Sequence, residues 1–363
     1  MTNDATPTPL RVALIGFGAA GMYFHAPFIA STPGLRLAVI VTRNPGRAAQ
    51  ARAEYPGVEI LDQAADLWAR RDDVDLVVVA APNVAHVPLA TTAIEAGLPV
   101  VVDKPLAVTA AQAREVVTLA RERGVPLTVF QNRRFDGDFQ TLRTLLADGA
   151  LGVPLRFESR FERWRPVPKS GWRESGAPED GGGLLMDLGS HLIDQALALF
   201  GPVSRVYGEL DRRRADVAVD DDVFVALTHT NGVRSHLWMS VLASQLGPRF
   251  RLLGDKASYV KFGLDMQEDQ LRAGLRPEGA SWGEEPVDRW GTFGTGDDAR
   301  QVATAQGHYG RFYAGVAAAL RDGGPMPVDP EDACRTLEII EAARQSAIEQ
   351  RVVTLAWRSR PAE

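Results

Sequence analysis

Three side chains in this sequence are suited to moving a proton and to stabilising negative charge on a reacting oxygen. Lys104 stands between Asp103 and Pro105 at the end of an apolar run. Asp187 and His191 are four residues apart behind three consecutive glycines, so on a helix they share one face. An imidazole with a pKa of about 6.5 accepts a hydroxyl proton near neutral pH, and an ammonium group stabilises an alkoxide. We therefore predict a catalytic group made of Lys104, Asp187 and His191.

Each member of this group also has a structural interpretation. Lys104 is a surface lysine paired with Asp103 if its motif stands alone, whereas the proline that follows favours a lysine held at a strand end. Asp187 either caps a helix beside a structural histidine or forms half of a metal site with His191. No further cluster of histidine, cysteine or carboxylate accompanies this pair in the sequence, so we predict no metal.

A glycine-rich stretch near the start of the chain predicts the binding of a dinucleotide. It follows the apolar run Val12–Ile15 and opens a helical pattern, the context in which GxGxxG holds a pyrophosphate at a helix N-terminus. The first glycine permits a tight turn, the second lets the backbone approach the phosphates, and the third lets helix and strand pack closely. A glycine-rich turn without a ligand is the alternative. The residues are Gly16, Phe17, Gly18, Ala19, Ala20 and Gly21.

The end of the second apolar run indicates which nicotinamide dinucleotide binds. Enzymes that use NAD usually carry Asp or Glu about 20 residues after the glycines, where the carboxylate binds the ribose 2′-hydroxyl. This sequence has Thr42 and Arg43 there and no carboxylate. Arg43 is suited to pairing with a 2′-phosphate, with an added hydroxyl from Thr42, although a solvated loop arginine is the alternative. We predict NADP in preference to NAD.

A third apolar run ends in residues expected near the nicotinamide. Parallel sheets bind ligands at the carboxyl ends of their strands, so we expect Ala81, Pro82 and Asn83 beside the nicotinamide half. His86 either touches the cofactor or caps the following helix, and the sequence leaves both open.

Weaker candidates exist for binding a polyol substrate. Arg133 and Trp172 suit a polar, aromatic wall against a hydroxyl-rich ligand, and Tyr309 either reaches the same crevice or belongs to the core. Solvated charge for the arginine and core packing for the rings are the competing interpretations.

The elements that must position these residues fall into two groups. Residues 1–130 alternate short Val/Ile/Leu-rich runs with helical patterns, which predicts a Rossmann dinucleotide-binding domain with a parallel sheet. The predicted strands are Leu10–Gly16, Leu35–Val41, Leu76–Ala81, Pro99–Asp103 and Pro126–Gln131.

Residues 131–363 predict an α+β domain with an open, largely antiparallel sheet for substrate binding and oligomerisation. Leu155–Arg165 alternates apolar and charged residues with a period of two, as in a strand with one solvated face. Asn231-Gly232 predicts a hairpin turn. Helices are expected over about 184–200, 309–321 and 330–349, whereas the irregular, glycine-rich segment 264–305 receives no predicted element.

Composition excludes several classes of protein. The 363 residues carry a formal charge of −6, so nothing in the charge favours binding to nucleic acid. The single cysteine, Cys334, cannot form an internal disulfide and is expected to be a buried apolar residue. No signal sequence and no apolar run of about 20 residues is present, so we expect a cytoplasmic protein without a membrane segment.

The chain resembles the Gfo/Idh/MocA oxidoreductases over essentially its whole length, and most closely their NADP-dependent scyllo-inositol dehydrogenases. The resemblance implies the catalytic and cofactor roles given above and an open sheet used to form homodimers or homotetramers. One departure is Asp103, where the family more often has glutamate. The matching segments are GFGAAG (16–21), FHAPF (24–28), AAPNVAH (80–86), DKP (103–105), QNRRFDGDF (131–139), GGGLLMDLGSHLIDQAL (181–197) and KFGLDMQEDQL (261–271).

These observations predict an NADP-dependent enzyme that interconverts a secondary hydroxyl and a ketone on a cyclitol or sugar. A reductase of keto-sugars or other carbonyl compounds is the first alternative, because the same residues serve the reverse reaction. A dinucleotide-binding sensor without catalysis is the second, and the presence of Lys104, Asp187 and His191 argues against it.

Overall fold

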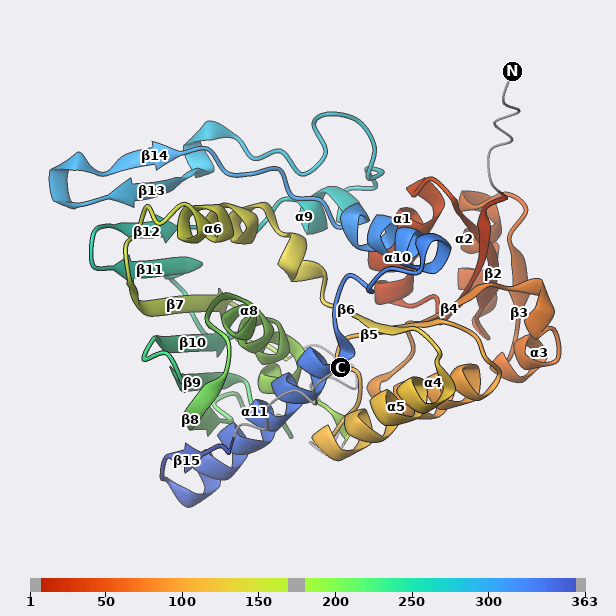
Figure 1. Cartoon of the computed structure of the whole chain (residues 1–363), viewed down its shortest axis with the longest axis horizontal. Helices are drawn as coiled ribbons and strands as arrows, with labels where there is room; N and C mark the ends of the chain where they lie inside the picture. Colours follow the sequence, from red (N-terminus) through yellow and green to blue (C-terminus); the bar gives the residue numbers. More distant parts are fainter. Residues whose placement is uncertain (1–7, 169–179, 357–363) are drawn as a thin grey trace.

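The computed structural model describes residues 8–168 and 180–356, which form two β-sheets joined through a shared apolar core (Figure 1). Trp172, a predicted substrate residue, lies outside the described residues. In Figure 1 the sheet of the N-terminal half lies on the right and the sheet of the C-terminal half on the left. The substrate and cofactor candidates are carried by the segments between and around these sheets.

The first sheet is parallel, with the strand order β3-β2-β1-β4-β5-β6, and confirms the predicted Rossmann-like fold. All five predicted strands are present. The prediction missed β3, whose three residues are only partly buried and lack an apolar run. The strands are β1 (Leu10–Ile15), β2 (Leu35–Val41), β3 (Glu59–Leu61), β4 (Leu76–Val79), β5 (Val100–Asp103) and β6 (Leu127–Phe130).

Capping side chains fix where the helices of this half begin. Asn44 Oδ1 accepts a hydrogen bond from the Arg47 amide (3.0 Å) at the start of α2, and Pro45 supplies a preset φ. Thr109 caps α5 in the same way, and Gly124 ends that helix in a left-handed conformation. The helices are α1 (Ala26–Ser31), α2 (Pro45–Glu54), α3 (Ala64–Trp68), α4 (His86–Glu95) and α5 (Ala110–Arg123).

The second sheet has the order β14-β13-β12-β11-β7-β10-β9-β8-β15 and is antiparallel except for the pair β7–β10. This confirms the predicted fold class, and β9 and β10 form the antiparallel hairpin predicted at Asn231-Gly232. Segment 264–305, which received no prediction, contains α9 (Gln267–Arg272) and two further strands. The strands are β7 (Pro154–Glu162), β8 (Val203–Asp211), β9 (Asp222–His229), β10 (Arg234–Ser240), β11 (Phe250–Gly254), β12 (Ser258–Lys261), β13 (Gly291–Gly294), β14 (Arg300–Val302) and β15 (Val353–Thr354).

Helices of the C-terminal half hold the two sheets together. α11 (Pro330–Glu349) packs against β8 and α8 (Ser190–Phe200) and also against α5 of the first half. α10 (Gly310–Asp322) packs on α1, next to the glycine-rich loop, and α6 (Gly137–Ala147) follows the first sheet. Among the described residues, no helix has both the length and the apolar composition needed to cross a membrane.

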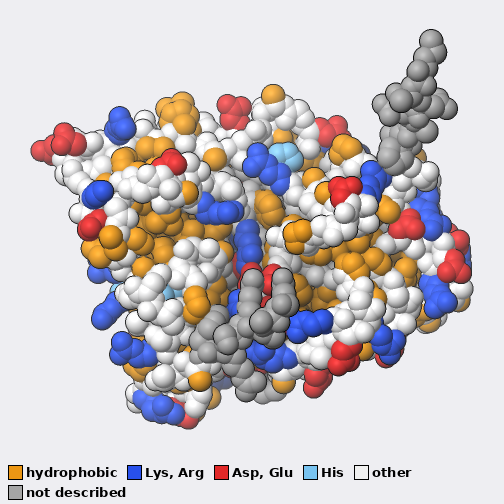
Figure 2. Space-filling view, viewed as in Figure 1, with side chains coloured by type: hydrophobic (Ala, Val, Ile, Leu, Met, Phe, Trp, Pro, Cys, Tyr) orange, Lys and Arg blue, Asp and Glu red, His pale blue; other side chains and the backbone are white. Residues whose placement is uncertain are grey.

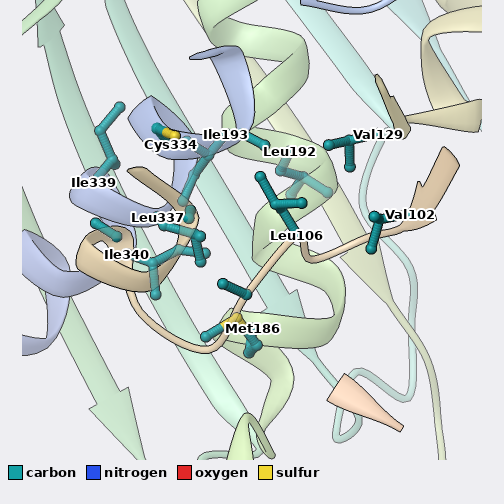
Figure 3. Packing of buried hydrophobic residues seen from close by; sticks show 14 of the residues in the cluster. Val102, Leu106, Val129, Met186, Leu192, Ile193, Cys334, Leu337, Ile339 and Ile340 are labelled. Atoms are coloured by element: carbon teal, nitrogen blue, oxygen red, sulfur yellow. The ribbon is translucent and has the colours of Figure 1, made fainter. Parts of the chain in front are cut away.

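The core between the sheets is continuous (Figure 3). Val102 of β5 and Leu106, which follows this strand, lie in one buried cluster with Leu192 of α8 and Leu337 of α11. Cys334 is fully buried in the same cluster, as expected for an apolar cysteine. Truncating a leucine in such a core costs about 2–5 kcal/mol. The segments that carry Lys104 and His191 are therefore held against each other by packed side chains.

Candidate active site

A cavity of about 350 Å³ lies between the two halves of the chain, at the carboxyl end of β5. Its wall includes Ala19 and Ala20 of the glycine-rich loop on one side, and Asp187 and His191 on the other. Lys104 lies on the same wall. In Figure 2 basic side chains gather in the hollow between the two halves. The three residues predicted to be catalytic therefore face one enclosed space.

Lys104 connects the first half of the chain to the second. It directly follows β5 and is joined to Pro105 by a cis peptide bond. Its Nζ donates hydrogen bonds to the carbonyl oxygen (2.7 Å) and to Oδ1 (2.8 Å) of Asp187. Only 13% of the lysine side chain is exposed, so the ammonium group is held rather than solvated. Its partner is Asp187 and not Asp103, the neighbour considered in the surface-lysine interpretation.

Asp187 and His191 come from a helical segment that is not uniform. The sequence predicts one helix over about 184–200, whereas the structure has a π-helical turn at Leu185–Gly189 followed by α8. Gly189 fits this wider turn, because a Cβ there would lie 3.0 Å from Leu185 and 3.2 Å from Met239. Both functional side chains still reach the same cavity.

His191 is a buried, neutral imidazole. Burial, followed by the positive charges of Lys104, Arg133 and Arg249, moves the pKa of His191 well below its ordinary value. Its Nδ1 has no hydrogen-bond partner within the part of the chain that the structure describes. A neutral imidazole with an unused nitrogen beside an ammonium group is suited to accepting a proton from a hydroxyl.

The glycine-rich loop forms a cradle that fits a dinucleotide. Gly16 has a φ of +102°, and a Cβ there would lie 2.3 Å from the carbonyl oxygen of Ala80. A Cβ on Gly21 would lie 2.2 Å from the Gly16 carbonyl oxygen. At Gly18 the space is open, and the nearest atom to a Cβ is Arg47 Nη1 at 3.8 Å. The outer two glycines are thus required by packing, whereas Gly18 leaves room for a ligand against the backbone.

Phe17 contributes only its backbone to this loop, because its ring is buried against Tyr55 with centroids 6.4 Å apart. Ala19 and Ala20 are on the cavity wall. The helical segment that follows begins with a π-helical turn, Ala20–His25, and continues into α1.

Thr42 and Arg43 lie in a second hollow at the end of β2. Thr42 is buried and its Oγ1 accepts a hydrogen bond from the Asn44 amide (3.4 Å), whereas Arg43 is exposed. Arg47 of α2, which the sequence analysis missed, has its Nη1 on the open side of Gly18.

The segment after β4 joins the two halves of the site. Asn83 Nδ2 donates to the carbonyl oxygen of Gly181 (3.1 Å), and a Cβ on Gly181 would lie 2.9 Å from that nitrogen. Pro82 precedes Asn83 in the turn that leads to α4. The absence of a side chain at Gly181 thus admits the Asn83 side chain. Asn83 therefore links the first half of the chain to the segment that carries Asp187.

His86 does not cap its helix through its side chain. Its Nδ1 lies 2.7 Å from the Pro105 carbonyl oxygen and its Nε2 lies 2.8 Å from the Ala81 carbonyl oxygen. Burial lowers the pKa of His86. The ring thus joins the loop after β4 to the loop that carries Lys104.

The predicted substrate residues have different environments. Arg133 lines the cavity, and its Nη2 donates to Glu268 (2.7 Å) while its guanidinium lies 4.7 Å from the Phe161 ring centre. Tyr309 is fully buried, does not line the cavity, and donates from its hydroxyl to Asp136 (2.7 Å). The sequence analysis did not select Glu268, although this residue lies in the matching segment KFGLDMQEDQL (261–271).

Metal-ligating side chains are not clustered in the described residues. Within residues 8–168 and 180–356, no group of three or more His, Cys, Asp or Glu side chains has an arrangement suited to a metal ion.

Comparison with known proteins agrees with this geometry. An NAD-binding Rossmann fold of an oxidoreductase family matches residues 10–131, and the C-terminal alpha/beta domain of the same family matches residues 143–355. The chain belongs to the Gfo/Idh/MocA oxidoreductase family. This confirms the family resemblance and shows that the protein is a dehydrogenase or reductase with an NAD(P)-binding domain.

Several members of the Gfo/Idh/MocA family are similar over nearly the whole chain. The uncharacterized oxidoreductase YdgJ of Escherichia coli is 41% identical over 96% of this chain and 99% of its own length. The scyllo-inositol 2-dehydrogenase (NADP(+)) IolW of Bacillus subtilis is 31% identical over 95% of this chain and 96% of its own. The solved oxidoreductase yvaA from Bacillus subtilis superposes with a TM-score of 0.90 at 31% identity, covering 96% of this chain and 99% of that one.

Proposed function

We propose that the protein is an NADP-dependent oxidoreductase that interconverts a secondary hydroxyl and a ketone on a cyclitol or sugar. The observation that carries this proposal is the convergence of Lys104, Asp187 and His191 on one cavity whose wall continues into the glycine cradle. In a dehydrogenase, the reacting carbon must lie between a nicotinamide and a group that exchanges a proton with its oxygen. In this cavity, Ala19 and Ala20 of the glycine-rich loop lie on the cofactor side, and His191 can exchange the proton.

The side chains divide the chemistry among them. NADP, when bound in the cradle, supplies the acceptor for the hydride that leaves the carbinol carbon. Neutral His191 takes the hydroxyl proton, so the alcohol becomes a ketone and the imidazole becomes an imidazolium. The Lys104 ammonium donates a hydrogen bond to the reacting oxygen and stabilises the negative charge that develops there. Asp187 holds that ammonium in place through its carboxylate and its backbone carbonyl.

Residues near β2 support NADP as the cofactor. Thr42 and the exposed Arg43 lie in a hollow at the end of β2, where a ribose 2′-phosphate would meet a guanidinium. No carboxylate stands between Val41 and Gly46 to prefer a 2′-hydroxyl. The printed name of IolW, a whole-length relative, specifies NADP(+) as well as scyllo-inositol.

The protonation state of His191 favours the oxidation of an alcohol as the assayed direction. An imidazole that is neutral at pH 7 is ready to accept a proton, whereas carbonyl reduction begins from its protonated form. A reductase acting on a keto-sugar uses the same residues in reverse and remains the alternative.

We also propose that the chain divides after residue 130 and assembles through its second sheet. The two sheets separate at this point, between β6 and β7. On one face of β9 and β10, Phe224, His236 and Trp238 form a half-exposed aromatic row, with the Phe224 and Trp238 centroids 5.1 Å apart. Covering such a row in a homodimer or homotetramer would remove apolar area from water. Light scattering of the purified protein tests this.

The absorbance of reduced nicotinamide tests the catalytic proposal. The protein is incubated with scyllo-inositol and either NADP or NAD, and then with keto-sugars and NADPH. We expect turnover with NADP, and loss of turnover in Lys104→Ala and His191→Ala while NADPH binding changes less than about twofold. Arg143→Ala, an exposed position on α6, is the matched control. Unchanged turnover in either active-site variant would show the catalytic assignment to be wrong.

A further inference from the structure

Cationic side chains outnumber acidic ones on the wall of the active-site cavity. Among the described residues there are six cations and four carboxylates, and His191 adds no charge because it is neutral. The cations are Lys104, Arg133, Arg163, Arg165, Arg214 and Arg272. The carboxylates are Asp103, Asp187, Asp220 and Glu268. A neutral cyclitol does not need this excess of positive charge.

The carboxylates nearest the reacting group already have partners. Asp187 Oδ1 lies 2.8 Å from Lys104 Nζ. Glu268 is shared by two cations, with Arg133 at 2.7 Å and Arg272 at 2.9 Å. Asp187 and Glu268 therefore already form ion pairs with Lys104, Arg133 and Arg272, and not with Arg163.

Arg163 is the cation without such a partner. Within residues 8–168 and 180–356, its guanidinium makes no hydrogen bond or ion pair. The more distant charges that act on it are the carboxylates of Glu268 and Asp187 and the guanidinium groups of Arg133 and Arg165. Its guanidinium lies over the Phe161 ring, 4.9 Å from the ring centre. Burial lowers the pKa of Arg163, so the charge is held in a partly dry environment. A desolvated guanidinium with five unused donors is an anion site.

The backbone fixes the position of this side chain. The Arg163 amide donates to the Ser240 carbonyl oxygen (2.8 Å), and the Arg163 carbonyl oxygen accepts from the Ala243 amide (3.1 Å). Arg163 directly follows β7, so it lies on the side of the second sheet. The phosphates of a dinucleotide belong at the other wall, where Gly18 and Ala19 lie. A ligand group that reaches Arg163 is therefore part of the substrate.

We propose that the substrate carries an anionic group, a carboxylate or a phosphate, that is bound by Arg163. This inference rests on the proposed function of the cavity and narrows its substrate from sugars and cyclitols to acidic ones. The anion sits on the second-sheet side, and the hydroxyl to be oxidised faces Lys104 and His191. Arg163 thus selects and orients the substrate and takes no part in the transfer of the proton or the hydride.

Calorimetric titration of the enzyme–NADP complex separates the possibilities. The probes are D-glucuronate, D-glucose 6-phosphate and D-glucose, which share a ring and differ in charge. We expect at least one acidic probe to bind about 10- to 100-fold more tightly than D-glucose, the range for a charge-assisted hydrogen bond. Preference for the first probe identifies a carboxylate site, and preference for the second a phosphate site.

Two variants decide whether Arg163 is responsible. Arg163→Gln should remove the preference for the acidic probe and leave the Kd values of D-glucose and NADP within about twofold. The control variant Arg143→Gln, at an exposed position on α6, should keep the preference for the acidic probe. The inference would be overturned if neither acid bound more tightly than D-glucose, if the preference survived in Arg163→Gln, or if Arg163→Gln weakened NADP affinity. Binding of an acid through Arg163 would leave this inference standing even if Lys104→Ala or His191→Ala kept full turnover, which is the outcome that contradicts the proposed catalytic roles.

Discussion

The ammonium group of Lys104 donates to both the backbone carbonyl oxygen and the carboxylate of Asp187, a residue 83 positions further along the chain. One residue follows β5 of the first sheet, and the other precedes α8 of the second. This double contact joins the two halves at the wall of the candidate active-site cavity. An ion pair with the adjacent Asp103 would lie within the first half of the chain. The observed pair with Asp187 forms only when the two halves pack against each other.

The carboxylate of Asp187 should therefore matter for turnover and little for cofactor affinity. Asp187→Asn keeps the backbone carbonyl contact and removes the negative charge that orients the ammonium group. Because charge-assisted hydrogen bonds contribute about 1.5–3 kcal/mol, we expect kcat to fall roughly 10- to 100-fold. Steady-state kinetics and a fluorescence titration with NADPH measure the two effects. Asp148→Asn, at the exposed end of α6, controls for the substitution, and an unchanged kcat would contradict the proposed role.

The pH dependence of alcohol oxidation should reflect the environment of His191. Burial and the nearby charges of Lys104 and Arg133 hold the pKa of His191 well below its usual value, so the ring stays neutral as the solution becomes mildly acidic. We expect kcat/KM for oxidation to remain constant from pH 7 through about pH 6.5 and to fall only below that. A profile over roughly pH 5 to 8 checks this. An acid limb centred at or above the ordinary histidine value would contradict it.

The same shift should make the fold less stable in acid. The folded pKa of His191 lies below its unfolded value, so between the two values the unfolded chain binds the additional proton. The free energy of unfolding therefore falls as the pH drops below about 6.5, and this loss ends below the folded pKa. His191→Gln should have a shallower dependence in that window. Denaturant titrations of both proteins at several pH values measure it, and parallel curves would argue against a buried neutral imidazole.

Two glycines of the cradle should respond differently to the same substitution. Gly16→Ala places a Cβ 2.3 Å from a backbone oxygen at a φ of +102°, so we expect destabilisation by more than about 3 kcal/mol. Gly18→Ala meets only Arg47 Nη1 at 3.8 Å, so the protein should fold normally. Its methyl group occupies the space for the pyrophosphate, and the Kd of NADP should rise roughly tenfold or more. Thermal unfolding with and without NADP separates the two effects, and equal behaviour of the variants would contradict the geometry.

The sequence predicted the fold where local chemistry and tertiary packing agree. Continuous apolar runs mark the central strands because both faces of that sheet are buried, and Asn231-Gly232 marks a hairpin because few residue pairs adopt its turn. The short strand β3 was missed because it is at the sheet edge and partly exposed. The π-helical turn at Leu185–Gly189 was missed because close packing against Met239, rather than helix propensity, determines it.

The site was predictable to a similar degree and for a similar reason. Lys104 and His191 are in recognisable contexts, a strand end and a glycine-flanked helix, so their types suggested their chemistry. Arg163 has no such context, because its lack of a partner is a property of the assembled cavity and not of the chain around it. Tyr309 is the opposite case: the sequence suggested that its ring binds substrate, whereas the structure buries the ring in the core.

Selectivity between the two nicotinamide cofactors should depend on Arg43 and not on its neighbour Arg47. Arg43→Ala should weaken NADP binding by roughly 10- to 100-fold and leave NAD binding within about twofold, because only NADP carries the 2′-phosphate. Arg47 lies beside Gly18, so Arg47→Ala should weaken both cofactors about equally through the shared pyrophosphate. Titrations of each variant with both cofactors give four affinities. A parallel loss in Arg43→Ala would show that the arginine does not recognise the 2′-phosphate.

Tyr309 should contribute to stability and not to substrate affinity. Its hydroxyl is fully buried and donates to Asp136, and burial raises the pKa of that carboxyl group well above its ordinary value despite the nearby Arg133. Tyr309→Phe leaves the Asp136 oxygen without this donor in a dry environment, so we expect a loss of about 1–3 kcal/mol in the free energy of unfolding. The KM for substrate should stay within about twofold, because the ring does not line the cavity. Tyr207→Phe, whose hydroxyl meets Glu209 at the surface, should change neither quantity. If Tyr309→Phe raised the KM and left stability unchanged, this prediction would be wrong and Tyr309 would be a substrate-binding residue.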